Sequence, residues 1–291
     1  MTIAHIINPV KVDSSSDLFK AQPVTFRTLL KSKKASNQNG KINQYLVGYP
    51  EDEIMFPQGF SKLPALGRSV MDVGNFSVTR KLPLIADILN ALNPIEADYI
   101  VYTNVDIALM PYFYDFLFEK IASGSDSLII NRRVIEKHVS EAQMYAEIGK
   151  KHPGYDCFVF KKELLKNFVF ENTCIGANFI GRIMYANLLL FSNRLEIIKN
   201  AHLTFHIGED GAWLDQRFNE FDTFNKNQVK QALNKLLELN IPDEKRSKLL
   251  KLLTFVENFK KTDSKKGINN SKTSLSGKIW RRIIKKRLLC L

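Results

Sequence analysis

Residues 98–109 read DYIVYTNVDIAL, and this stretch decides the predicted fold. Residues 99–102 are a continuous run of tyrosine, isoleucine and valine, all of which favour β-structure. Such runs are typical of parallel strands that are buried on both faces of a sheet. The pattern therefore predicts one buried strand over residues 98–109, with Asn104 and Asp106 near its carboxyl end.

Predicted strands and helices alternate on either side of this stretch. Further strands are expected over residues 2–10, 44–48, 127–131, 157–160 and 194–199, and helices over residues 21–34, 82–92, 112–121, 227–239 and 243–259. This alternation indicates an α/β fold in which helices flank a mostly parallel sheet, with a helical extension at the C-terminal end. Residues 202–211 are rich in polar side chains and are expected to form a loop.

The net charge of +12 is concentrated at the C-terminal end of the 291-residue chain. From Lys226 onward there are 18 lysines and arginines against 5 aspartates and glutamates, whereas residues 1–225 hold 24 against 25. A nucleic-acid-binding domain carries positive charge on its folded body. The nearly neutral body therefore argues against nucleic acid as a partner and favours a basic appendage with a partner of its own.

Cysteine usage and hydropathy indicate a cytoplasmic protein. The three cysteines, Cys157, Cys174 and Cys290, are odd in number and have no CxxC spacing, which argues against a disulfide framework and a zinc site. No stretch reaches the roughly 18 apolar residues of a transmembrane helix, and residues 1–12 lack the features of a signal peptide. We expect reduced thiols in the cytoplasm.

Asp106 is the first candidate ligand for a metal ion. Ligands of parallel α/β sheets bind where strands end at their carboxyl side, and a carboxylate placed there is costly unless it meets a metal or another cation. The alternative is that Asp106 caps the helix that begins near Met110, although it lies too far upstream for a clean cap and Pro111 already suits that helix start. The residues alone leave both interpretations open.

The stretch over residues 98–107, together with the order of elements from Thr2 to about Asp210, resembles the GT-A glycosyltransferases, whose Asp-x-Asp motif lies on such a strand. The resemblance implies a nucleotide-diphospho-sugar transferase in which Asp106 binds Mn²⁺ or Mg²⁺ and the metal bridges the donor diphosphate. A hard cation takes oxygen ligands and neutralises charge that builds on the leaving phosphate. Asn104 replaces the first Asp of the motif; it can hydrogen-bond a ribose hydroxyl or a metal-bound water but brings no charge.

Three further residues are candidates for donor binding. Glu51 and Asp52 follow the second strand, where GT-A enzymes often place an acidic residue against the nucleoside, and the resemblance implies this contact for Asp52. Arg80 and Lys81 precede the helix expected over residues 82–92 and, with its N-terminus, can face a diphosphate. A solvated loop or surface explains each of these residues equally well.

Residues 152–156 read HPGYD and lead into the apolar run over residues 157–160. A Pro-Gly turn places Tyr155 and Asp156 just before that strand. Tyr155 can stack on a sugar ring and Asp156 can accept a proton from a hydroxyl, and some glycosyltransferase-like proteins carry a similar stretch at the acceptor side. We predict that His152 and Tyr155 bind the acceptor and that Asp156 is catalytic; a turn in which Asp156 binds backbone donors is the alternative.

His206 is the second candidate metal ligand. Many GT-A enzymes supply a metal ligand from a histidine late in the fold, and His206 matches that place by its order in the chain. A hydrogen-bonded structural histidine is the alternative. Glu209, Asp210 and Trp213 follow closely and are predicted to contact the acceptor, with simple packing as the alternative for Trp213.

Two other functions compete with glycosyl transfer to a glycan or lipid-linked acceptor. Sugar nucleotidyltransferases have a similar core fold but carry a Gly-rich, Arg-containing loop after the first strand, whereas residues 8–13 read NPVKVD and contain no glycine. The second alternative is a non-catalytic nucleotide-sugar or glycan-binding protein that keeps the fold. Its main support is Asn104.

The C-terminal residues predict a separate membrane-binding element. We divide the chain into a GT-A-like catalytic domain over residues 1–225, a helical extension over 226–260, a flexible linker over 261–277 and a basic amphipathic helix over 278–291. Apolar side chains occupy one half of that last helix, with Trp280 at its rim, and basic side chains occupy most of the other. Such a helix suits the anionic inner face of a membrane; docking on the protein's own core or on a partner subunit is the alternative.

Overall fold

The structure is a computed structural model that describes residues 1–208 and 216–259. Met1–Phe259 forms one compact unit, and residues 260–291 lie outside the described residues. The predicted linker and the predicted C-terminal amphipathic helix both fall in residues 260–291. Within the described part of the chain, none of the helices combines the length and the apolar character needed to cross a membrane.

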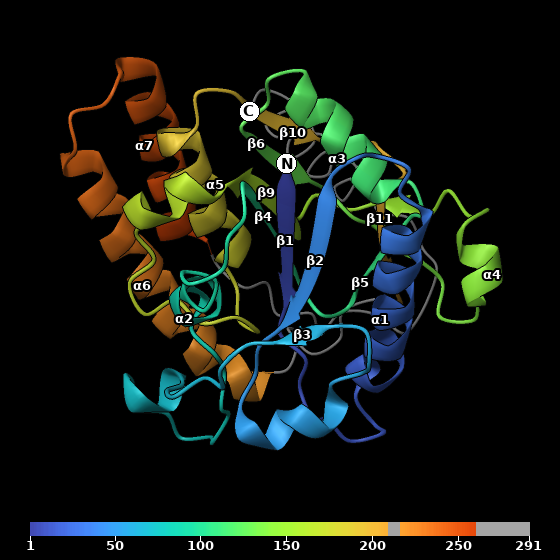
Figure 1. The fold of residues 1–291 in the computed structure, drawn as a ribbon. Helices are drawn as coiled ribbons and strands as arrows, with labels where there is room; N and C mark the ends of the chain where they lie inside the picture. The colour runs from blue at the N-terminus through green and yellow to red at the C-terminus, as the bar shows by residue number, and fades with distance from the viewer. Residues whose placement is uncertain (209–215, 260–291) are drawn as a thin grey trace, which may run out of the picture. The chain divides into compact units, whose positions relative to one another are not determined.

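A seven-stranded sheet forms the centre of the first unit, in the strand order β10-β6-β9-β4-β1-β2-β3. Its strands are β1 (Thr2–Ile7), β2 (Lys41–Leu46), β3 (Ser61–Lys62), β4 (Tyr99–Thr103), β6 (Ser127–Ile130), β9 (Cys157–Lys161) and β10 (Leu195–Ile198). Strands β1 to β4 are parallel to one another and β6 is parallel to β10, whereas β9 runs antiparallel between β4 and β6. The predicted α/β class with a mostly parallel sheet is confirmed (Figure 1).

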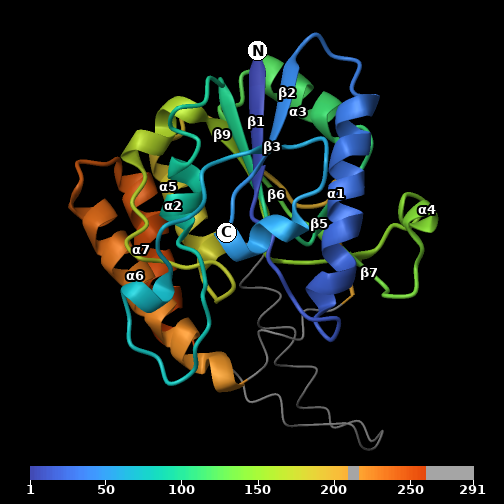
Figure 2. The same ribbon diagram turned by 60° about the horizontal axis from the view of Figure 1, so that its bottom comes forward.

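Helices cover both faces of this sheet (Figures 1 and 2). One face carries α1 (Asp17–Ala35) and α3 (Phe113–Ala122), and the other carries α2 (Ile85–Asn90), α5 (Ile180–Phe191), α6 (Asn219–Glu238) and α7 (Asp243–Asn258). Along β4, Val101 belongs to the hydrophobic cluster under α1 and α3, and Ile100 to the cluster under α5 to α7, because successive side chains of a strand point to opposite faces. Burial from both sides is the reason why the apolar run of this strand is continuous.

A smaller four-stranded sheet, in the order β5-β11-β7-β8, begins just after β4. Its strands are β5 (Ile107–Leu109), β7 (Arg133–Ile135), β8 (Lys150–Lys151) and β11 (Thr204–Ile207), and the short helix α4 (Glu141–Met144) lies between β7 and β8. The 3₁₀ helices of the described residues are η1 (Pro50–Met55), η2 (Val70–Asp72), η3 (Lys162–Asn167) and η5 (Gln216–Phe218). Strand β11 pairs antiparallel with β5 and parallel with β7, so this sheet joins segments that are distant in the sequence.

Two predicted elements differ from the structure, and helix α5 is absent from the prediction. The strand expected over residues 98–109 is two strands in different sheets, because the chain turns after β4 and the Ile107 amide donates to the Asn104 carbonyl oxygen at 3.2 Å. The loop expected over residues 202–211 contains strand β11, which pairs with the distant strands β5 and β7. Helix α5 was not predicted because its sequence, IGRIMYANLLLF, is nearly apolar all round and has only a weak polar face.

The predicted boundary between residues 225 and 226 falls inside helix α6. Buried side chains of α6 and α7, such as Leu233 and Leu249, belong to the same hydrophobic cluster as the sheet and α5. These two helices are therefore part of the compact unit that ends at Phe259.

The two cysteines of the described residues, Cys157 and Cys174, are buried and free. Burial raises the pKa of both thiols, that of Cys174 to about 12. Neither thiol is therefore suited to nucleophilic or redox chemistry near neutral pH. Cys290 lies outside the described residues.

Candidate functional site

A cleft of about 1260 Å³ opens at the carboxyl edge of the large sheet. The segments that follow β1, β2 and β4 line it, together with the residues that precede β9. Because β9 is antiparallel, its first residue, Cys157, pairs with Thr103 at the end of β4, and the residues before it reach the same edge. The predicted site residues that the structure describes all line this cleft: Asp52, Arg80, Lys81, Asn104, Asp106, His152, Tyr155, Asp156 and His206.

The turn between β4 and β5 places Asn104 and Asp106 in the cleft. The Tyr102 hydroxyl donates to Asn104 Oδ1 at 3.1 Å, and burial raises the pKa of Tyr102 well above its usual range, which keeps this donor protonated. Asp106 Oδ1 is buried and has no hydrogen-bond partner among the described residues. A buried carboxylate oxygen without a partner is energetically costly, and a bound cation or a bound sugar donor would supply the missing partner.

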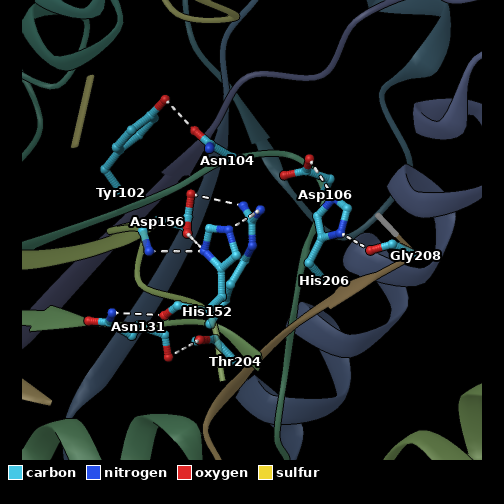
Figure 3. A network of polar contacts seen from close by, with 11 residues as sticks. Tyr102, Asn104, Asp106, Asn131, His152, Asp156, Thr204, His206 and Gly208 are labelled. Atoms are coloured by element: carbon cyan, nitrogen blue, oxygen red, sulfur yellow. Dashed lines mark hydrogen bonds and ion pairs between the residues drawn. The ribbon is translucent and has the colours of Figure 1, made fainter. Parts of the chain in front are cut away.

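Strand β11 brings His206 beside Asp106, because His206 pairs with Ile107 of β5. His206 Nε2 lies 3.1 Å from Asp106 Oδ2, and His206 Nδ1 lies 2.9 Å from the Gly208 carbonyl oxygen (Figure 3). Since a carbonyl oxygen can only accept, Nδ1 carries a proton, and Nε2 of the neutral ring then presents a lone pair to the carboxylate. The lone pair and the carboxylate oxygen repel each other. A proton on Nε2, or a cation bound by both groups, removes this repulsion. His202, the other histidine of the segment, does not line the cleft; its ring contacts the Glu147 carbonyl oxygen.

A divalent cation fits the donor atoms that Asp106 and His206 provide. Carboxylate oxygen and imidazole nitrogen are both ligands that Mn²⁺ accepts, and Mg²⁺ accepts the carboxylate with water and phosphate oxygens. Residues 1–208 and 216–259 contain no group of three His, Cys, Asp or Glu side chains that could hold a metal. Asp106 and His206 would be its two protein ligands, and water and substrate oxygens would supply the others.

Asp156 forms an ion pair with a buried arginine at the back of the cleft. Arg132 Nη1 lies 3.0 Å from Asp156 Oδ1, and the two side chains are only 6% and 12% exposed. His152 approaches the same carboxylate, with Nδ1 at 3.9 Å from Oδ2, while its Nδ1 accepts a hydrogen bond from the Gly154 amide at 3.0 Å (Figure 3). The ion pair with Arg132 fixes the position of the Asp156 carboxylate in the cleft.

Arg80 and Lys81 reach the cleft from the segment before α2. Lys81 Nζ donates to Glu51 Oε1 at 2.6 Å, and this hydrogen bond lowers the pKa of Glu51. Lys81 Nζ also lies 3.9 Å from the centre of the Tyr49 ring. Arg80 donates to the Gly176 carbonyl oxygen at 3.2 Å. Both cations are partly exposed, and a donor diphosphate at this wall would meet their charge.

Asp52 is buried and joins two loops of the cleft wall. Its Oδ1 accepts a hydrogen bond from the Lys11 amide at 2.8 Å, and its Oδ2 accepts one from the Tyr49 amide at 3.2 Å. Burial raises the pKa of Asp52, and the two amide hydrogen bonds oppose that shift. These bonds tie the loop after β1 to the loop after β2, so the structure gives Asp52 a structural role, and its contact with a nucleoside stays a prediction.

Arg132 and the segment over residues 175–182 are cleft-lining features that sequence reasoning missed. Arg132 follows β6, and the rule that ligands bind beyond strand ends would have selected it from the sequence. Asn225 of α6 holds the other segment: its side chain donates to the carbonyl oxygens of Cys174 and Asn178 at 2.7 and 3.0 Å. No local sequence pattern predicts that long-range anchor.

The end of that segment has an unusual backbone conformation. Phe179, the residue before the first turn of α5, has φ of +80° in the left-handed region. Its ring lies edge-on to Phe259, with centroids 5.2 Å apart, and both residues line the cleft. The predicted acceptor residues Glu209, Asp210 and Trp213 lie outside the described residues.

Comparisons with known proteins give structural matches alone. No family model matches the chain, and no curated protein matches its sequence. The structure of residues 1–349 of S. aureus TarS in complex with UDP-GlcNAc is similar, with a TM-score of 0.56 and 10% identity over 88% of this chain and 72% of that one. The same TarS segment in complex with UDP matches with a TM-score of 0.50 and 11% identity over 92% of this chain and 76% of that one.

These matches concern the fold. TarS is a GT-A-type glycosyltransferase, and the match extends over most of the described chain. The chain therefore has a GT-A-like fold with C-terminal helices, as the stretch over residues 98–107 predicts.

Proposed function

We propose that this protein transfers a sugar from a nucleotide-diphosphate-sugar donor to a hydroxyl of a glycan or lipid-linked acceptor, with Mn²⁺ or Mg²⁺ as its cofactor. The observation that carries the proposal is the presence of two side-chain pairs, Asp106 with His206 and Asp156 with Arg132, in one cleft at the carboxyl edge of the sheet. The GT-A-like fold and the TarS complexes with UDP-GlcNAc and UDP support it.

At the donor end of the cleft, Asp106 and His206 would hold the cation, and Arg80 and Lys81 would face the diphosphate. When bound, the divalent cation supplies positive charge that stabilises the leaving diphosphate. The arginine and lysine side chains add charge-assisted hydrogen bonds to the same group. Asn104 would orient the donor through its amide group, since its oxygen already accepts from Tyr102.

At the acceptor end, Asp156 would take the proton of the attacking hydroxyl. The acceptor oxygen forms a bond to the anomeric carbon, the bond between that carbon and the diphosphate oxygen breaks, and the nucleoside diphosphate leaves with the electron pair. Arg132 would hold the Asp156 carboxylate in place through their ion pair. His152 and Tyr155 would contact the acceptor beside it, because both line the cleft next to this carboxylate.

A membrane role for the C-terminal end belongs to the same proposal. Residues 260–291 contain eleven lysines and arginines and one aspartate. We place the enzyme in the cytoplasm, with residues 278–291 bound to the anionic inner face of a membrane, where lipid-linked or nascent glycans would reach the cleft.

One observation favours a second candidate function, non-catalytic binding of a nucleotide-sugar. Asn104 brings no charge to the first position of the motif, and its oxygen is engaged by Tyr102. A site with one carboxylate binds a cation more weakly than a site with two.

Nucleotide release decides between the two functions. The full chain would be incubated with UDP- and GDP-sugars, Mn²⁺ and a mixture of glycans, and released UDP or GDP would be measured with and without a chelator. Release that the chelator abolishes supports the transferase. Binding of the nucleotide-sugars by calorimetry without any release supports the binding protein, and absence of both binding and release contradicts both functions.

A further inference from the structure

The cleft contains a cation that the proposed reaction does not use. Arg182 lies in the first turn of α5 and lines the cleft. Its guanidinium carbon is 4.5 Å from the centre of the Phe255 ring and 5.7 Å from the centre of the Tyr155 ring. A guanidinium held against aromatic faces keeps its N–H groups in its own plane, where they can still bind an acceptor.

Arg182 has neither an ion pair nor a side-chain hydrogen bond with any of the described residues. Other cations of the cleft differ in this respect, since Arg132 pairs with Asp156 and Lys81 pairs with Glu51. A partly buried guanidinium without a carboxylate partner among the described residues can form charge-assisted hydrogen bonds to an anion that comes from solution.

The position of Arg182 places that anion beside the acceptor. Arg182 contacts the ring of Tyr155, the residue directly before Asp156. The preceding residue, Gly181, packs so closely on this loop that a Cβ atom there would lie 3.0 Å from the Tyr155 carbonyl oxygen. The start of α5 is thus fixed to the wall that carries Asp156, whereas Asp106 comes from the turn before β5 and His206 from β11.

We infer that Arg182 binds an oxyanion carried by the acceptor, a phosphate ester or a carboxylate close to the hydroxyl that reacts. This inference rests on the proposed function and names the class of acceptor, an anionic sugar. The planar guanidinium fork matches the two oxygens of a phosphate or a carboxylate. The donor diphosphate is the competing anion, and Arg80 and Lys81 already provide cations for it.

The experiment compares three sugars that differ in one group: glucose 6-phosphate, glucuronate and glucose. Each is titrated into the full chain saturated with UDP and Mn²⁺, and the affinity is measured by calorimetry. We expect at least one anionic sugar to bind about tenfold or more tightly than glucose, because a bidentate charge-assisted hydrogen bond is worth about this much. The stronger of the two anions identifies the oxyanion as phosphate or carboxylate.

Arg182→Met keeps an unbranched side chain against Phe255 and removes the charge. We expect this variant to lose the preference for the anionic sugar, to bind glucose as before and to bind UDP as before. Arg27→Met is the matched control, since Arg27 is exposed on α1 and does not line the cleft. Arg182→Lys, which keeps the charge without the planar fork, should retain part of the preference and covers the case in which Arg182→Met fails to fold.

An unchanged preference in Arg182→Met would overturn the inference. A fall in UDP affinity with the preference intact would also overturn it, because Arg182 would then belong to the donor site. Absence of UDP binding by the unmodified chain is a different result, since it contradicts the proposed function whichever sugar binds.

Discussion

Asp106 and His206 are 100 residues apart in the sequence, yet Asp106 Oδ2 and His206 Nε2 lie 3.1 Å apart. The pairing of β11 with β5 produces this proximity. Because the chain leaves the large sheet after β4 and enters the small one at β5, Asp106 stands at the junction of the two sheets. The candidate cation site is therefore a product of that junction, and substitutions at either residue test it directly.

Asp106→Ala should abolish the Mn²⁺-dependent part of UDP binding. The substitution removes the carboxylate that would hold the cation and also relieves the buried, unsatisfied Oδ1, so the protein should stay folded. Calorimetric titration of UDP with Mn²⁺ and with a chelator measures the effect. Binding that depends on Mn²⁺ as strongly as in the unmodified chain would remove Asp106 from the site.

His206→Ala should weaken Mn²⁺ binding far more than His202→Ala. His206 lines the cleft, whereas His202 does not, so the second variant is the control for loss of a histidine in the same segment. A metal competes with a proton for Nε2, so Mn²⁺ affinity should also fall as the pH is lowered. Equal affinities of the two variants would contradict the assignment.

Asp156→Asn should lower turnover by about 10²–10⁴-fold with little change in donor affinity. A positioned carboxylate contributes this much to proton transfer, and asparagine keeps the shape while it removes the basic group. Turnover is measured as nucleotide release and donor affinity by calorimetry with UDP. Glu141→Gln, on α4, is a control for loss of a carboxylate outside the cleft, and near-normal turnover of Asp156→Asn would take Asp156 out of the mechanism.

The free energy of unfolding should fall as the pH drops below about 6.5, because of His5. This side chain is fully buried, bonded to the Tyr114 hydroxyl at 2.8 Å and to Thr103 Oγ1 at 2.9 Å, and burial lowers its pKa from 6.5 to about 3. Between these two values the unfolded chain binds the extra proton, so the contribution of His5 to stability is fully present above pH 6.5 and is lost toward pH 3, by at most about 5 kcal/mol.

Denaturant unfolding at several pH values measures this dependence. In His5→Gln the slope between pH 6 and pH 4 should decrease by up to one proton, while His138→Gln, an exposed histidine, should leave it unchanged. A slope that is the same in all three proteins would show that His5 titrates normally.

The full chain should sediment with anionic liposomes at low salt, and a chain that ends at Gly277 should not. Each basic residue near such a surface contributes about 1 kcal/mol, and salt screens this attraction. The compact unit ends at Phe259, so removal of residues 278–291 leaves it complete. Equal sedimentation of the two proteins would refute the membrane role without affecting the proposed reaction.

The sequence predicts the large sheet well because its central strand is buried on both faces. That burial produces a continuous apolar run over residues 99–102, which is visible locally. The end of β4 cannot be located from the sequence, because Val105 and Ile107 continue the apolar pattern through the turn. Strands β4 and β5, which belong to different sheets, therefore read as one strand in the sequence.

The candidate site is predictable only in part, for a similar reason. Candidate residues that follow strand ends could be selected from the sequence. The predicted site residues that the structure describes all line one cleft. Pairs that form through tertiary contact could not be selected. The ion pair between Arg132 and Asp156 depends on the neighbouring positions of β6 and β9, and the anchor from Asn225 depends on the packing of α6.

The left-handed backbone conformation of Phe179 has opposite consequences for stability and for binding. A residue with a Cβ atom in that region costs about 1 kcal/mol or more relative to glycine. Glycine would remove this cost, but it would also remove the ring that meets Phe259 at the cleft. A library at position 179 selected for thermal stability would thus enrich glycine, and one selected for turnover would keep an aromatic residue. The residue found at position 179 would then show whether a selection favoured thermal stability or turnover.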